Sequence, residues 1–273
     1  NLGVAPLLFL QVLYGNFFYT ASIVIGIPWI ILPVLLIIAY YSAYGIVFKK
    51  GNFVRFKLIL SITTSIIFAW IAFLMVNINT LMMVPKNWKI YFSSKSGLNL
   101  NLSESTLWPR YIFYLFLLLA IGGAFTALFY TFQKNKEESK LGFHFGSLIS
   151  GYFCFLCIPA FILYLFLLPE NVKNSLYQQN TMWTLLPVVF ILGLLLTGYL
   201  NFKRKITSSS IFFALSLVLF VFIRNFIRLI YLKPFSAKFS AISSNTQYSV
   251  MVLFFVCLLA GLGLIGWILK KTA

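Results

Sequence analysis

Acidic side chains are almost absent from this sequence. Its 273 residues include no aspartate, and its four glutamates are Glu104, Glu137, Glu138 and Glu170. Only 9% of the residues are charged, whereas a soluble domain carries about 25% charged residues. This composition excludes an ordinary soluble enzyme. The 31 Phe and 15 Tyr residues exclude a disordered chain, which has far fewer large apolar side chains.

The 21 Lys and Arg residues give a net charge of +17, which alone would suit a nucleic-acid-binding protein. However, they lie in short clusters between long apolar runs, and no basic face remains once those runs are set aside. This pattern is typical of polytopic membrane proteins. We therefore expect membrane lipids, and not nucleic acid, among the partners.

A helix needs about 20 consecutive apolar residues to span a membrane, and the sequence contains eight candidates. They are Gly3–Ile25, Pro28–Phe48, Leu58–Val76, Tyr111–Phe132, Gly142–Leu168, Trp183–Phe202, Ser209–Leu232 and Val250–Leu269. The sequence thus predicts an all-α bundle of about eight transmembrane helices. We expect residues 1–273 to form a single integral membrane domain.

The basic residues predict how this bundle is oriented, because Lys and Arg accumulate in cytoplasmic connections. With the N-terminus inside, the inner connections carry twelve: Lys49, Lys50, Arg55, Lys57, Lys134, Lys136, Lys140, Lys203, Arg204, Lys205, Lys270 and Lys271. The longer outer connections carry seven: Lys86, Lys89, Lys95, Arg110, Lys173, Lys233 and Lys238. Both termini are therefore expected on the cytoplasmic side of the membrane. The longest outer connection, 77–110, contains a mixed apolar and basic segment, 81–88, that suits either the membrane interface or an ordinary loop.

Residues that bind metal or haem are scarce. His144 is the only histidine, so this chain alone cannot supply the two axial histidines usual for a membrane haem b. His144 is either a candidate ligand of a haem shared with a partner or an ordinary interfacial histidine. Cys154 and Cys157 form a CxxC without the following His of a covalent haem site, so we expect them to pack in the core, as we do Cys257. No cluster of ligands predicts a zinc site.

The position of the glutamates disfavours two further classes. None lies inside an apolar run, where an ion-coupled carrier usually keeps an acid. None is placed to orient the single histidine, as the acid of a hydrolase triad does.

Three residues are candidate quinone contacts. Gln11 and Tyr19 share one face of the first expected helix with Gly15 and Ser22. Polar groups on such a face bind either a quinone head group or a neighbouring helix. Glu170, in a Pro-Glu pair, ends the fifth expected helix, where it would either accept a proton from a quinol or remain solvated.

Small residues predict where helices pack closely. Gly261, Gly263 and Gly266 match GxGxxG, but they lie inside an apolar helix with no preceding strand, so they do not predict a dinucleotide site. Together with the small residues in 120–127 and 142–146, they predict helix–helix contacts for the fourth, fifth and eighth expected helices.

Arg224 and Arg228 are the most distinctive residues of the apolar runs. They lie four apart on one face of the seventh expected helix, with Tyr231 three residues further on. No acid within an apolar run can pair them, so the predicted partner is an anion from outside the chain: a haem propionate, a carboxylate of a partner or a lipid phosphate. Arg224 is the deeper of the two, so we expect it to need this partner more than Arg228, which can reach water.

Two stretches resemble a known group of proteins. The first is Gly3-Val-Ala-Pro-Leu-Leu-Phe-Leu-Gln-Val-Leu-Tyr-Gly15, continued by Phe17-Phe-Tyr-Thr20, and the second is Arg224-Asn-Phe-Ile-Arg228 with Tyr231-Leu232. Together they resemble poorly characterised bacterial polytopic membrane proteins associated with multihaem c-type cytochromes. The resemblance covers about a tenth of the chain. It implies an electron-transport setting in a bacterial inner membrane and assigns no catalytic residue.

Three functions remain open from the sequence. The first is an integral membrane subunit of a respiratory electron-transfer complex, which anchors a periplasmic c-type cytochrome and contributes to a quinol site. In that hetero-oligomer the haem belongs to the partner, and the chain alone carries no cofactor. The second is a transporter or transferase for an anionic lipid, and the third is an assembly scaffold without chemistry of its own.

Overall fold

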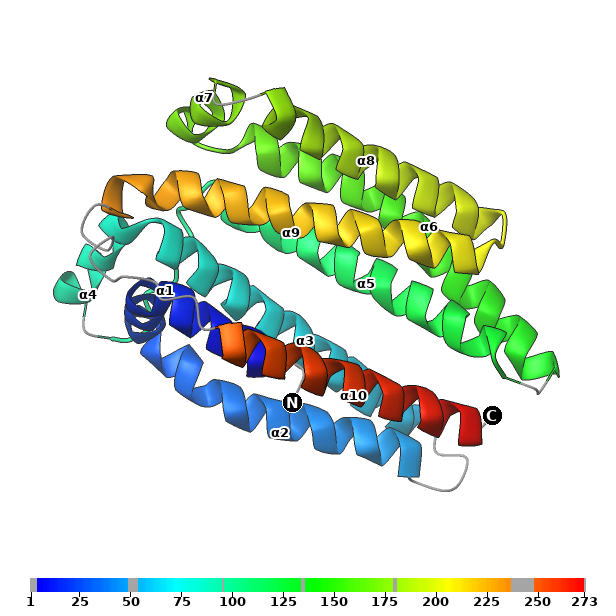
Figure 1. Cartoon of the computed structure of the whole chain (residues 1–273). Coiled ribbons are helices and arrows are strands. Elements are labelled where there is room, and N and C mark those ends of the chain that lie inside the picture. Colours follow the sequence, from blue (N-terminus) through cyan, green and yellow to red (C-terminus); the bar gives the residue numbers. More distant parts are fainter. Residues whose placement is uncertain are drawn as a thin grey trace.

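A computed structural model describes residues 4–48, 54–94, 96–133, 136–178, 181–236 and 248–272, and the described part contains helices and no strand (Figure 1). In chain order the helices are α1 (Val4–Val24), α2 (Gly26–Phe48), α3 (Val54–Met83), the short 3-10 helix η1 (Pro85–Lys89), α4 (Ile90–Ser93), α5 (Leu107–Thr131), α6 (Lys136–Phe166), α7 (Glu170–Gln178), α8 (Thr181–Phe202), α9 (Ile206–Ser236) and α10 (Tyr248–Thr272). The all-α fold class is confirmed.

Six of the described helices are long and apolar enough to cross a membrane, so the chain is a multi-pass membrane protein. They are Gly26–Phe48, Val54–Met83, Leu107–Thr131, Ser139–Phe166, Leu185–Phe202 and Ile206–Phe235. The expected number of eight is therefore wrong for the described residues. The expected eighth span is helical as α10, but its described apolar stretch, Val252–Leu264, is shorter than a membrane crossing.

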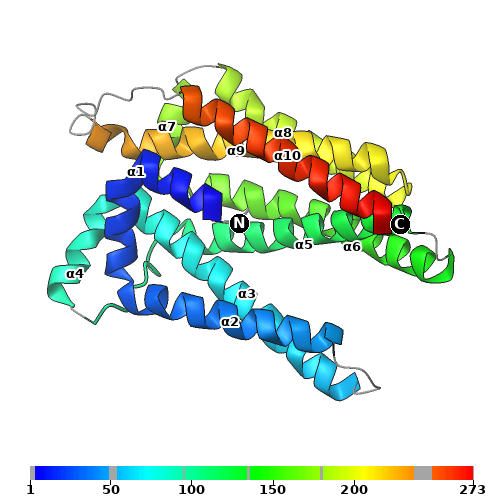
Figure 2. The same cartoon turned by 60° about the horizontal axis from the view of Figure 1, so that its bottom comes forward.

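The expected first span is broken instead of continuous. Tyr14 interrupts α1 with non-helical backbone angles, φ −134° and ψ 29°, and Figure 2 shows the two parts of the helix pointing in different directions. Gly15 and Asn16 follow directly, and both are poor helix formers. Neither part of α1 is long enough to cross a bilayer alone.

The helices form two groups that lie side by side. One group is α5, α6, α8 and α9, which we call the four-helix unit; the other is α1, α2 and α3, which we call the N-terminal unit (Figures 1 and 2). Each helix of the four-helix unit contributes at least one buried phenylalanine to a shared core, and four of these rings meet: Phe113, Phe161, Phe190 and Phe220. Their ring centroids lie 4.8 to 6.2 Å apart. Cys154 and Cys157 are buried in the same core, as expected, whereas Cys257 is exposed.

Two glycines allow α5 and α6 to pack with their backbones in contact. A Cβ atom on Gly123 would lie 2.5 Å from the Ser150 backbone nitrogen, and one on Gly146 would lie 2.6 Å from that of Ala127. The predicted close packing of these two helices is therefore confirmed. On α10, nothing lies within 4 Å of such an atom on Gly261 or Gly263, so the described residues bring no helix of this chain against these two glycines.

Two segments expected as loops or helix ends have other roles. The third span continues to Met83, and Asn77 and Thr80 are buried within it. The backbone N–H of Asn101 donates to Asn77 Oδ1 (3.2 Å), and the Thr80 hydroxyl donates to the backbone carbonyl of Asn77 (2.8 Å). The following segment folds into η1 and α4, and Trp88 Nε1 donates to the Leu81 carbonyl at 2.9 Å. Glu170 does not end the fifth span but begins α7, where its charge suits a helix N-terminus.

The connections alternate between the two ends of the bundle. Those joining α2 to α3, α5 to α6 and α8 to α9 lie at the end where α10 finishes, and α4, α7 and the α1–α2 turn lie at the opposite end (Figure 1). We call the latter the α7 end. Basic residues that the structure describes at the other end include Arg55, Lys57, Lys140, Lys203, Arg204 and Lys205.

Candidate anion site

Arg228 on α9 is buried toward the α7 end of the bundle. Its side chain is 5% exposed, and its guanidinium carbon lies 4.9 Å from the centre of the Tyr14 ring. The Tyr14 hydroxyl donates to Asn225 Oδ1 at 3.3 Å, one helical turn away from Arg228. The break in α1 thus places Tyr14 against α9, where its ring supports the cation.

Two nitrogens of this buried guanidinium, Nε and Nη2, have no hydrogen-bond partner. They lie on the same edge of the planar group, and this edge binds a carboxylate or phosphate through two parallel hydrogen bonds. Buried donors are rarely left without partners, because the loss of hydration is costly. The Nε–Nη2 edge of Arg228 therefore has the chemistry of an oxyanion site.

Arg224, one helical turn farther from the end of α9, is exposed, whereas Arg228 is buried. Because α9 continues to Ser236, Arg228 lies about 12 Å and Arg224 about 18 Å from its end, at 1.5 Å per residue. Residues four apart differ by about 40° around a helix. The boundary between the packed and exposed faces of α9 falls within that interval, so Arg228 is enclosed and Arg224 is not.

A second buried arginine, Arg110, was missed because the sequence suggested an outer connection. It is 4% exposed, and its Nη2 donates to the Tyr164 hydroxyl at 3.2 Å, while Nη1 lies 3.8 Å from Met83 Sδ. Its guanidinium also lies over the Tyr164 ring at 4.8 Å, and its Nε has no partner. Pro109 was the signal that could have found it, since proline is favoured in the first turn of a helix and α5 begins at Leu107.

Tyr231 belongs to the surroundings of Arg110. Its hydroxyl is buried beside Thr106 without a hydrogen bond of ordinary geometry, and it lies within electrostatic range of Arg110. Tyr114 lies within electrostatic range of both Arg110 and Arg228. The two arginines with Tyr14, Tyr114, Tyr164 and Tyr231 therefore form one polar group, which we call the arginine–tyrosine cluster.

The structure describes the side chains of two of the three candidate quinone contacts. Tyr19 is 66% exposed on α1, and Glu170 is exposed on α7. The Ser22 hydroxyl donates to the Tyr19 carbonyl of its own helix at 2.7 Å. The side chain of Gln11 lies outside the described residues.

His144 is exposed near the end of α6 opposite the α7 end, where Arg204 Nη2 lies 3.3 Å from its Nδ1. A guanidinium only donates hydrogen bonds, so Nδ1 is the acceptor and the proton of the neutral ring is on Nε2. Among the residues described, no three His, Cys, Asp or Glu side chains gather where a metal ion could bind.

Comparison with protein-family models, curated proteins and solved structures finds no match to this chain.

Proposed function

We propose that this protein is an integral membrane subunit of a bacterial respiratory electron-transfer complex. In this proposal it anchors a periplasmic multihaem c-type cytochrome, and Arg228 binds an anionic group at the junction. The haem belongs to the partner subunit, and a quinone is the membrane-soluble electron carrier of the complex. The α7 end faces the periplasm, as the distribution of basic residues favours.

The observation that carries the proposal is the unpartnered Nε–Nη2 edge of Arg228. A charge left unpaired in the membrane costs at least about 2.5–3.5 kcal/mol on insertion scales. An arginine in this setting is stabilised by an anion that the chain itself does not provide. Haem propionates and partner carboxylates both fit a bidentate edge.

A second observation supports the proposed electron-transport setting of this edge. The two stretches that resemble cytochrome-associated membrane proteins meet at it, since Tyr14 belongs to the first stretch and Arg228 to the second. Leu232, also in the second stretch, packs with Phe17 and Phe18 of the first. Segments that are about 200 residues apart thus build one surface at the α7 end.

A transporter or transferase for an anionic lipid is the second candidate, because a lipid phosphate also fits the Nε–Nη2 edge. The test uses Arg228→Leu, with Arg224→Leu as the matched control on the same helix. The tagged subunit is purified in mild detergent, and c-type haem and phospholipid are measured per mole of protein.

We expect Arg228→Leu to lower bound haem at least tenfold and Arg224→Leu to leave it within twofold of wild type. Arg228→Lys should retain only part of it, because an ammonium cannot form the two parallel bonds. Loss of phospholipid with no haem bound to any variant would favour the lipid-handling function. Wild-type levels of both after Arg228→Leu would overturn the anion site.

The sidedness is tested by cysteine labelling in a Cys257→Ala background. Ser96→Cys at the α7 end should react with an impermeant thiol reagent added to spheroplasts, and Lys205→Cys at the other end should not. The opposite labelling pattern would contradict the proposed periplasmic junction.

A further inference from the structure

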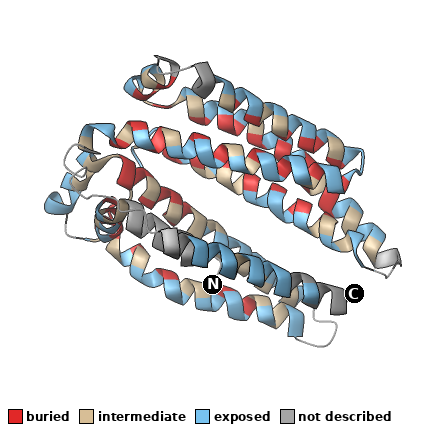
Figure 3. Cartoon of the chain, viewed as in Figure 1, coloured by how far each residue is buried: buried red, intermediate tan, exposed pale blue. Residues whose placement is uncertain are grey.

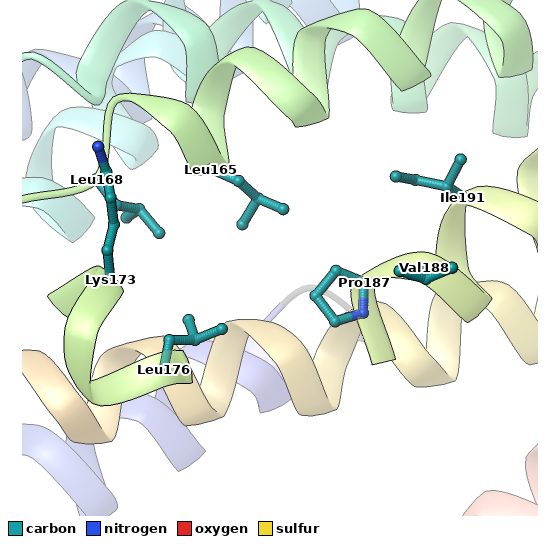
Figure 4. Close-up of a pocket in the computed structure, with 7 residues that line it drawn as sticks. All are labelled: Leu165, Leu168, Lys173, Leu176, Pro187, Val188 and Ile191. Atoms are coloured by element: carbon teal, nitrogen blue, oxygen red, sulfur yellow. The ribbon is translucent and has the colours of Figure 1, made fainter. Parts of the chain in front are cut away.

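A second feature of the α7 end is a pocket of about 220 Å³ beneath the short helix α7. Its walls are Leu165 and Leu168 from the end of α6 and the turn after it, Lys173 and Leu176 from α7, and Pro187, Val188 and Ile191 from α8 (Figure 4). Six of these seven side chains are purely apolar, and the seventh is a lysine. The pocket shares none of its lining residues with the arginine–tyrosine cluster.

The sequence of α7 explains why this helix covers the end of the bundle. Val172 and Leu176, four residues apart, are buried, whereas Asn171 and Asn174 on the other side are exposed. Such an amphipathic helix lies at the boundary between hydrocarbon and head groups. The pocket beneath it is therefore at the depth where an acyl chain joins its head group.

The burial of the lining residues shows how the pocket is entered. Leu168 and Leu176 are 3% and 6% exposed, while Val188 is 51% exposed on the outer side of α8. The apolar wall thus continues from the lipid-facing surface of α8 inward to α7. Pro187 contributes a rigid wall without a backbone N–H group.

Lys173 supplies the only charge among the described residues that line the pocket. Its side chain runs beside Leu168, away from Pro187 and Ile191 (Figure 4), and its ammonium lies 5.1 Å from the centre of the exposed Phe166 ring. The aliphatic stem of such a lysine packs on apolar surface while its charge reaches the head-group layer. A cation there favours a negatively charged head group.

We propose that this pocket binds one acyl chain of an anionic phospholipid, with Lys173 contacting the phosphate. The occupant is a phospholipid and not a quinone, because a quinone head group carries no charge for Lys173 to select. The site is independent of the proposed function and remains if Arg228 binds a partner, a lipid or nothing.

The test measures binding to purified, delipidated protein by native mass spectrometry. Dioleoylphosphatidylglycerol and dioleoylphosphatidylcholine are the two probes, which share acyl chains and differ in net charge. Val188→Trp fills the pocket mouth, and Val189→Trp is the matched control, since Val189 is similarly exposed but does not line the pocket. Lys173→Gln removes the charge, with Lys205→Gln as its control at the other end of the bundle.

We expect wild type to bind the phosphatidylglycerol at least fivefold more tightly than the phosphatidylcholine. Val188→Trp should weaken binding of both lipids at least fivefold, Lys173→Gln should abolish the preference, and both controls should behave as wild type. Equal binding of the two lipids by wild type would overturn the proposal, as would an unchanged Val188→Trp or retention of a quinone in their place. Monodisperse elution of each variant shows that it is folded, and Lys173→Gln tests the site without altering its shape.

Discussion

Two helices of nearly equal apolarity, α2 and α6, are buried to very different extents. Of the most apolar 18-residue stretch of each, 39% is buried in α6 but only 11% in α2. Figure 3 shows the same contrast, with buried residues concentrated along the inner faces of the four-helix unit and α2 largely exposed. In a membrane, apolarity determines whether a helix inserts, but packing against other helices depends on small residues and complementary shape.

The residues at the helix contacts explain the difference. In the four-helix unit, Gly123 and Gly146 bring α5 and α6 together. In α2 the buried residues are few, and they include Leu32, Ala39 and Ser42 along one narrow line. The wide remaining face of α2, which carries Tyr41, is available to lipid or to a partner subunit.

The largest expected effect comes from the phenylalanine core. Phe161→Ala should lower the free energy of unfolding by about 3–5 kcal/mol, because it leaves a cavity among three other buried rings. Phe68→Ala in α3, where the ring is 41% exposed, should cost less than about 1.5 kcal/mol. Equilibrium unfolding in mixed micelles measures both. Equal losses would show that the two units are packed alike.

The second effect concerns the close approach of α5 and α6. Gly146→Leu should cost about 3 kcal/mol, since even its Cβ atom meets the backbone of Ala127. The matched control is Gly261→Leu in α10, whose surroundings are open and whose melting temperature should be unchanged. A large loss at Gly261 would instead reveal packing against another molecule, such as a second copy of the chain.

The third effect concerns polar contacts between helices. Asn201 on α8 donates to Ser150 Oγ of α6 and accepts from Ser209 Oγ of α9, both at 2.8 Å. Asn201→Leu removes both bonds and should cost about 1–2 kcal/mol. Thr64→Val in α3 is the control, because Thr64 donates to Leu60 within its own helix. Comparable thermal shifts for the two variants would contradict an interhelical role for Asn201.

The smallest effect is expected on α2. Tyr41 is 75% exposed, so Tyr41→Ala should change the unfolding free energy of the isolated chain by no more than about 0.5 kcal/mol. If the partner subunit covers this face, the same variant should still lower co-purification of that subunit. No change in either quantity would assign this face to lipid alone.

The sequence predicted the all-α membrane fold and the central part of each of the six spans, because hydropathy alone decides insertion. It could not locate the ends of α3 and α5. Asn77 and Thr80 looked like loop residues, but Asn77 Oδ1 and the Thr80 hydroxyl form hydrogen bonds inside the protein. Arg110 was assigned to a loop for the same reason, although it lies within the first turns of α5.

The candidate site was predicted only in part. Arg228 and Tyr231 were identified from their position in an apolar run. The sequence did not show that Arg228 contacts Tyr14 of α1, whereas Tyr231 lies near Arg110 of α5. Sequence spacing placed Arg224 and Arg228 on one face, and only packing distinguishes the enclosed arginine from the exposed one. The support of Arg228 by Tyr14 required the break in α1. Gly15 and Asn16 indicate a break, but they do not show that Tyr14 packs against α9.

The contact between Tyr14 and α9 also bears on how the protein is made. Tyr14 and its partner Asn225 are 211 residues apart. At about 5–20 residues per second, roughly 10–40 s separate their synthesis. During that interval the first segment of the chain has none of its contacts on α9, and α1 can assume its final bent position only after the last span of the four-helix unit has inserted. The chain therefore completes its N-terminal unit late in biogenesis, although it synthesises that unit first.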